Sequence, residues 1–173
     1  MKRILIAIAI FIAATPATAF AVDRDDDVKI ESEDSIAYQQ SSSVASSEIE
    51  AKFPKEAKEI RAAHALHVKH AIDKDVDAYM DDFKLERMRY PELEREYAQR
   101  AMNLNRLQIE VKAVEFSEIT STSATIHTRQ VTQYDDETGT THIDDAIISY
   151  RWLKDANANS WKIAFTERRR LSN

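Results

Sequence analysis

Residues 120–154, TSTSATIHTRQVTQYDDETGTTHIDDAIISYRWLK, decide the fold class. On both sides of Gly139, the only glycine of the chain, β-branched and apolar residues alternate with polar ones, which is typical of half-buried strands. Residues 135–139, DDETG, carry the acidic and glycine residues of a hairpin turn. Two long antiparallel strands joined by this turn are therefore predicted.

Further strands and helices extend outward from this hairpin. An alternation of apolar and polar residues begins near Ile109 and returns over residues 161–170. Together with the two hairpin strands, it predicts a four-stranded antiparallel meander. Upstream of these strands the apolar residues recur at helical spacing. They predict a long first helix with Pro54 in its first turn. A short second helix follows Asp73 as its N-cap, and a third helix starts at Pro91. The apolar stripe of the third helix is predicted to be Leu93, Tyr97, Ala101 and Leu104. Helices followed by strands predict an α+β domain with three helices on one face of the sheet.

The N-terminus has the order of a secretory signal. Lys2 and Arg3 precede an apolar run over residues 4–14, and the small residues 17–19, ATA, follow. The run is shorter than the roughly 20 apolar residues that span a bilayer, so we expect cleavage after Ala19, with an uncleaved anchor as the alternative. The predicted organisation is a signal peptide at 1–19, an acidic and serine-rich disordered tether at 20–48 and one domain at 49–171. The working protein is then periplasmic or secreted, with no membrane span.

Charge and composition exclude several classes of function. The formal net charge of −6 becomes −8 without Lys2 and Arg3, so no basic footprint for nucleic acid exists. The absence of cysteine excludes disulfides and thiolate chemistry. We expect no cofactor. The only positive cluster of the domain, residues 168–170, RRR, should be split between two sheet faces, where it balances nearby acids or receives an anionic partner.

Five histidines invite a metal interpretation. His64, His67 and His70 spread over about 120° of the first helix, and two of them could hold a divalent ion, but no H-E-x-x-H pattern accompanies them. His127 and His142 lie on strands that should pair, and strand parity points them away from the pocket predicted below unless a β-bulge intervenes. We therefore predict no metal site and interpret these side chains as surface or partly buried histidines.

Residues 71–83, AIDKDVDAYMDDF, the later strands and the closing residues 161–163, WKI, resemble the nuclear-transport-factor-2-like (NTF2-like) superfamily, and its SnoaL-like group most closely. The resemblance covers about residues 50–171, and another helix-on-curved-sheet domain, such as a cystatin-like one, is the alternative. The resemblance implies a bent sheet that wraps the helices into a cone. It also implies a pocket for a small apolar molecule at the open end, and a homodimer through the outer sheet face.

The resemblance also implies where the pocket residues lie. If Trp161 and Ile163 point into the cone, strand alternation carries the residues that follow them at intervals of two to the same side. The predicted pocket consists of Tyr79, Phe83, Asp145, Ile147, Ser149, Arg151, Trp161, Ile163, Phe165 and Glu167. A buried Asp145 or Glu167 could act as a base, with Tyr79 donating a hydrogen bond to an oxyanion. Alternatively, Glu167 and Arg151 pair across the sheet, and Asp145 lies at an exposed strand end.

Two classes of function follow. We expect a non-catalytic exported domain that binds a small ligand, a peptide or an envelope protein. The alternative is a small-molecule isomerase, dehydratase or cyclase that uses a carboxylate in the cone.

Overall fold

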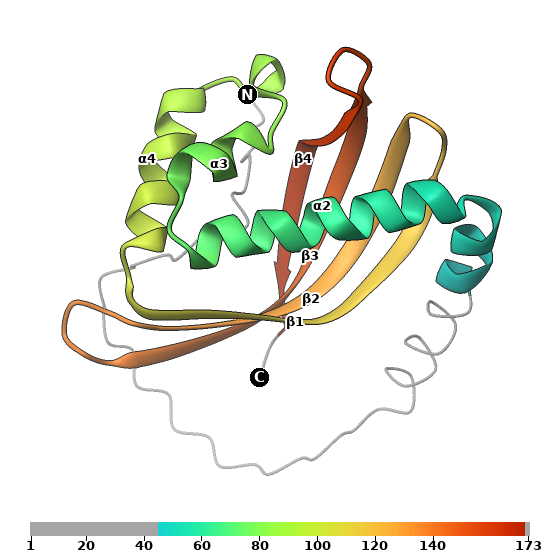
Figure 1. The fold of residues 1–173 in the computed structure, drawn as a ribbon. Coiled ribbons are helices and arrows are strands. Elements are labelled where there is room, and N and C mark those ends of the chain that lie inside the picture. Colours follow the sequence, from blue (N-terminus) through green and yellow to red (C-terminus); the bar gives the residue numbers. More distant parts are fainter. Residues whose placement is uncertain (1–44, 172–173) are drawn as a thin grey trace, which may run out of the picture.

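The computed structural model describes residues 45–171, which form helices followed by one curved sheet (Figure 1). The predicted signal peptide and the predicted tether, up to residue 44, lie outside the described residues. A helical segment over residues 45–52 comes first, so residues 45–48, expected in the tether, are helical. The other elements follow in the order α2 (Pro54–Ile72), α3 (Val76–Asp81), a 3₁₀ turn (Leu85–Arg87), α4 (Pro91–Met102), β1 (Asn105–Ile119), β2 (Ser123–Asp135), β3 (Thr141–Asp155) and β4 (Ser160–Arg170).

Local sequence signals explain the helix boundaries. Pro54 and Pro91 occupy the first turn of α2 and α4, where a missing backbone N–H costs nothing. The N-cap of α3 is Asp75, whose side chain accepts a hydrogen bond from the Ala78 N–H at 3.0 Å. The predicted N-cap, Asp73, instead ends α2 as its C-cap. None of the helices within residues 45–171 combines the length and apolar character needed to cross a bilayer.

The sheet has the strand order β1-β2-β3-β4, and all neighbouring strands are antiparallel, so the predicted meander and fold class are confirmed. The β2–β3 hairpin closes where expected, because Gly139 adopts a φ of +81° that favours glycine. Figure 1 shows α2 across the concave face of the sheet, with α3 and α4 at one end. We call the face covered by α2 the inner face and the opposite one the outer face.

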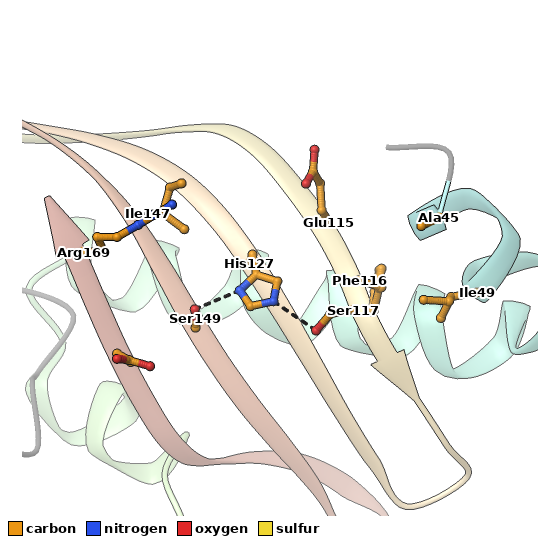
Figure 2. A pocket seen from close by; sticks show the side chains of 10 residues that line it. Ala45, Ile49, Glu115, Phe116, Ser117, His127, Ile147, Ser149 and Arg169 are labelled. Atoms are coloured by element: carbon orange, nitrogen blue, oxygen red, sulfur yellow. Dashed lines mark hydrogen bonds between the residues drawn. The ribbon is translucent and has the colours of Figure 1, made fainter. Parts of the chain in front are cut away.

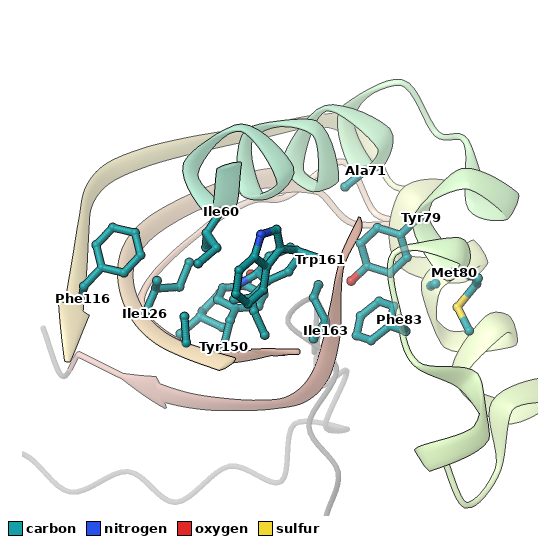
Figure 3. Packing of buried hydrophobic residues seen from close by; sticks show 14 of the residues in the cluster. Ile60, Ala71, Tyr79, Met80, Phe83, Phe116, Ile126, Tyr150, Trp161 and Ile163 are labelled. Atoms are coloured by element: carbon teal, nitrogen blue, oxygen red, sulfur yellow. The ribbon is translucent and has the colours of Figure 1, made fainter. Parts of the chain in front are cut away.

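The core lies between α2 and the inner face (Figure 3). Ile60 on α2 is fully buried, as are Ile126, Tyr150 and Trp152 on the central strands. The predicted α4 stripe is wrong by about one position, since Leu93 and Tyr97 are exposed. The buried residues of α4 are Ala98, Ala101 and Met102.

Both edges of the sheet are covered. The Phe116 N–H of β1 donates to the Ser46 hydroxyl at 2.9 Å, so the 45–52 segment caps this edge. At the opposite edge, residues 82–84 run beside β4. The Ile163 N–H donates to the Asp82 carbonyl at 2.8 Å, and the Lys84 N–H donates to the Ile163 carbonyl at 2.9 Å. Covered edges protect a sheet from pairing with other chains, and the second one also fixes Asp82 beside the core.

A β-bulge in β4 determines which side chains face the helices. Arg151 pairs with Phe165, but the next residue of β3, Trp152, pairs with Ile163, so Ala164 is an extra residue in β4. Trp161 and Ile163 are buried in the core, whereas Phe165 is 44% exposed. Beyond Ala164 the alternation is inverted, because a bulge shifts the side-chain parity of its strand.

Candidate functional site

The interior of the cone is filled by its own side chains. The Tyr79 ring stacks on His67 with 4.4 Å between centroids, and Phe83 and Tyr150 meet the same imidazole at 5.4 and 5.9 Å. A cavity of about 10 Å³ remains between His67, Tyr79, Gln130 and Tyr150. A single water needs about 10–15 Å³, so this space is too small for a small-molecule substrate.

A buried histidine–aspartate network lies beside this cavity. The Nδ1 atoms of His67 and His70 donate to the same Asp82 oxygen, Oδ2, at 2.9 and 3.0 Å. Burial lowers the pKa of His67, and the hydrogen bond to Asp82 opposes this shift without cancelling it. The His67 ring is therefore neutral near pH 7, with a proton on Nδ1 that orients it toward Asp82.

His64 has no such partner. Its side chain is 2% exposed, and neither ring nitrogen finds a hydrogen bond within residues 45–171. The ring packs edge-on against Tyr150 at 4.8 Å and Trp152 at 6.4 Å. Burial, followed by repulsion from Arg61 and from His67 once that ring is protonated, lowers the pKa of His64 to about 3. In the described part of the chain, no set of His, Cys, Asp or Glu side chains converges as a metal site.

The structure divides the predicted pocket between two faces. Tyr79, Phe83, Trp161 and Ile163 are buried inside the cone. The other members lie on the outer face: Asp145, Ile147, Ser149, Arg151, Phe165 and Glu167. For β4 the bulge at Ala164 is the cause, and for β3 the pairing of Trp152 with Ile163 sends Tyr150 and Ile148 inward. The prediction that these ten side chains share one side was wrong.

The candidate catalytic residues are therefore not brought together. Asp145 accepts a bidentate pair from Arg129, with Nη2 at 2.7 Å and Nε at 3.2 Å, so its carboxylate is neutralised by that guanidinium. Glu167 is exposed on the outer face. Tyr79 is buried on the inner side, and burial raises its pKa well above the usual value.

The outer face carries a much larger pocket of about 500 Å³ (Figure 2). A row of side chains crosses all four strands beneath it, because Glu115 pairs with His127, His127 with Ser149, and Ser149 with Glu167. Arg169 and Ile147, which face each other one step along the strands, extend the lining. Ala45 and Ile49 of the 45–52 segment complete it beyond the edge of β1. We call this the outer-face pocket.

His127 lies in the middle of the outer-face pocket. Its Nδ1 is 2.8 Å from the Ser149 hydroxyl and its Nε2 is 3.0 Å from the Ser117 hydroxyl. A serine nucleophile needs a carboxylate on the second ring nitrogen to hold the imidazole for proton transfer, and here that place is taken by a second serine. The geometry therefore suits hydrogen bonding to a ligand rather than acyl transfer.

His142, the other strand histidine, lies elsewhere. Its ring stacks on Tyr134 at 5.1 Å, and Nε2 is 2.7 Å from Asp136 in the hairpin turn. The two strand histidines thus serve separate contacts. His127 shares a face with Ser149 because the two residues pair directly in a register without a bulge, so the expectation that His127 points away from Ser149 was wrong. The bulge at Ala164 brings only Glu167 to that face.

The basic cluster at the end of β4 is split between two faces, as predicted. Arg168, on the inner side, forms an ion pair with Asp144, and Arg170 Nε is 2.9 Å from the same carboxylate. Arg169 points to the outer-face pocket. It makes no hydrogen bond or ion pair within residues 45–171.

Sequence reasoning missed the contact between His67 and Asp82 and the lining by Ala45 and Ile49. The first contact depends on residues 82–84 joining the edge of β4, and the second on the 45–52 segment docking on β1. Neither contact between distant segments leaves a local pattern.

Residues 64–171 match a known family, the C-terminal domain of anti-sigma-I factor RsgI9. The chain belongs to this RsgI9 C-terminal domain family. The match begins in α2 and includes the whole sheet, so both the buried histidines and the row beneath the outer-face pocket lie inside the family domain. Ala45 and Ile49, at the rim of the pocket, precede it. Among curated proteins, none matches this chain.

Solved structures identify the fold of this RsgI9-family domain. The Mycobacterium tuberculosis protein Rv3472, of unknown function, is 19% identical over 71% of this chain and 76% of its own, with a TM-score of 0.60. A proposed dehydratase of the NTF2-like family from Streptomyces avermitilis is 10% identical over 69% of this chain and 99% of its own, with a TM-score of 0.57. An NTF2-like protein with a cystatin-like fold from Novosphingobium aromaticivorans is 11% identical over 83% and 92%, with a TM-score of 0.56. The resemblance to the NTF2-like superfamily is thereby confirmed at the level of fold.

Proposed function

We propose that this chain is a non-catalytic binding domain and that its ligand occupies the outer-face pocket. One contrast carries the proposal: the cavity beside His67 and Tyr79 in the cone measures about 10 Å³, whereas the pocket on the other face offers about 500 Å³, the size typical of small-molecule sites. The pocket combines four apolar lining residues with six polar or charged ones, which can fix the orientation of a ligand. The name of the family points the same way, since an anti-sigma factor is a regulator rather than an enzyme.

The N-terminal sequence supports a place of action for this binding domain. The order of charged, apolar and small residues in 1–19 is that of an export signal, so we propose that the domain binds its ligand in the periplasm or outside the cell. The acidic and serine-rich residues 20–44 would then follow the signal as a tether that gives the domain reach.

A screen of small-molecule fragments against the isotope-labelled full chain, followed by NMR, tests the binding site. Ligands should shift the amide signals of His127, Ile147 and Ser149 at the outer-face pocket. Ser149→Trp should fill the pocket and abolish these shifts. The control Arg151→Trp places the same indole two residues away on the same face, outside the pocket, and should preserve them.

One observation favours a second function, acid–base catalysis in the cone. His67 is neutral, is oriented by Asp82 and stacks on Tyr79, and both rings line the remaining cavity. Such a group could move a proton if the cone opened to admit a substrate. Fragments that shift Tyr79, Gln130 and Tyr150 and still bind Ser149→Trp would favour this function and contradict the outer-face proposal.

A further inference from the structure

The charges of the outer-face pocket are arranged at its two ends. Glu115 lies on β1 at one end, and Glu167 and Arg169 lie on β4 at the other. None of these three side chains makes a hydrogen bond or ion pair within residues 45–171. Arg129, the neighbouring cation on the same face, is already neutralised by Asp145. Within residues 45–171, the pocket therefore offers an unpaired carboxylate at the β1 end, and an unpaired guanidinium beside a second carboxylate, that of Glu167, at the β4 end.

The middle of the pocket contains imidazole and hydroxyl groups that can hydrogen-bond. His127 and Ser149 occupy the two central strands, and their hydrogen bond of 2.8 Å keeps the imidazole parallel to the floor of the pocket (Figure 2). Ile147 and Ile49 supply apolar surface beside them. A ligand that lies diagonally from Glu115 toward Arg169 would thus meet an anion, then imidazole and hydroxyl groups with apolar surface, then a cation with Glu167 beside it.

From this arrangement we infer that the outer-face pocket binds a short zwitterionic peptide, with its ammonium group toward Glu115 and its carboxylate toward Arg169. The inference rests on the proposed function and names the ligand class of the same site. β1 and β4 are three strand spacings apart, roughly 14 Å between backbones. The long side chains of Glu115 and Arg169 can take up part of this gap, so we expect a ligand of about two or three extended residues, at about 3.3–3.6 Å per residue, to span the rest.

Both ends of the ligand are required by this charge pattern. A simple amine would leave the guanidinium of Arg169 unmatched, and a simple carboxylate would meet the repulsion of Glu115 and Glu167. Glu167 lies two residues from Arg169 on the same face of β4. Its charge repels a ligand carboxylate unless that carboxylate contacts the Arg169 guanidinium, and this sets the orientation of the ligand. Uncharged ligands would gain only the apolar contacts.

The test compares leucyl-leucine with its N-acetyl and C-amide forms, titrated into the labelled full chain by NMR. Leucyl-leucine should give saturable shifts at His127, Ile147 and Ser149, and removing either charge should weaken binding about tenfold, as expected for a lost charge-assisted hydrogen bond. The variants separate the two ends. Glu115→Gln should abolish the penalty of N-acetylation alone, and Arg169→Gln should abolish the penalty of C-amidation alone.

Matched controls are available on the same face. Glu118→Gln and Arg151→Gln each remove one charge outside the pocket lining. Both variants should bind leucyl-leucine, its N-acetyl form and its C-amide form with the wild-type affinities. If leucyl-leucine and its capped forms shift His127, Ile147 and Ser149 with equal affinity, the zwitterion inference is wrong, while the pocket remains a ligand site. An absence of shifts with leucyl-leucine, when fragments do bind there, would also overturn it. Fragments that bind only in the cone would instead overturn the proposed function itself.

Discussion

Mild acid should destabilise this fold through His64 before the carboxylates with lowered pKa values lose their charge. The pKa of His64 falls from 6.5 to about 3 in the folded chain, so the unfolded chain takes up a proton first as the pH drops. Stability supplied by the neutral ring is complete above pH 6.5 and is lost progressively toward pH 3. At pH 5 the loss amounts to 1.5 pH units at about 1.4 kcal/mol each, or roughly 2 kcal/mol. Burial of His67 shifts its pKa in the same direction.

Chemical unfolding at pH 8 and pH 5 measures this effect. The carboxyls whose pKa values are lowered by hydrogen bonds, such as Glu50 beside Arg61, lose their charge only below their ordinary value of 4.5 and stay ionised throughout. His64→Leu removes the titrating ring. It should reduce the pH-dependent loss by about 2 kcal/mol and change the stability at pH 8 by about 1 kcal/mol or less, because two unpartnered buried nitrogens disappear with it.

The control is His142→Gln, which removes an exposed histidine and should keep the wild-type difference between pH 8 and pH 5. If the wild type and His64→Leu lose the same stability between the two pH values, His64 is not the buried neutral base described above, and the argument fails.

Two further predictions concern contacts between distant segments. Ser46→Ala should lower the free energy of unfolding by about 1–3 kcal/mol, because it leaves the Phe116 N–H of β1 without its acceptor. Amide exchange over residues 45–52 should become faster, and unchanged exchange would contradict the prediction. Trp161→Phe should lower the free energy of unfolding, measured with a chemical denaturant, by about 1 kcal/mol, because the indole N–H no longer donates to Glu59 at 2.9 Å. A variant as stable as the wild type would show that this hydrogen bond contributes nothing.

The fold could be predicted because its signals are local and repeated. Alternation over 13 and 15 residues of β2 and β3, and a single glycine between them, leave few other ways to bury Ile126, Tyr150 and Trp152. The α4 error is also local. Residues 93 and 97 on one side and 98, 101 and 102 on the other form adjoining stripes, and only packing decides which stripe is buried.

The candidate site could not be predicted because it depends on one residue of register. The bulge at Ala164 has no composition signal, since alanine is acceptable on either face and no glycine or proline marks it. A prediction that continues the alternation past Ala164 places Phe165 and Glu167 in the cone. The structure places them outside, and the error carries over to every partner chosen for them on β3.

The same bulge links the closed cone to the open pocket. Before Ala164, β4 sends Trp161 and Ile163 inward, where they help to fill the cone with apolar surface. After it, the strand sends Glu167 and Arg169 outward, beside Ser149 and Ile147. Without the extra residue, those two charges would point at the helices, where burying an unpaired charge is costly. One inserted residue thus keeps Glu167 and Arg169 out of the cone and supplies the charged end of the pocket on the other face, which is why we propose that binding takes place on the outer face.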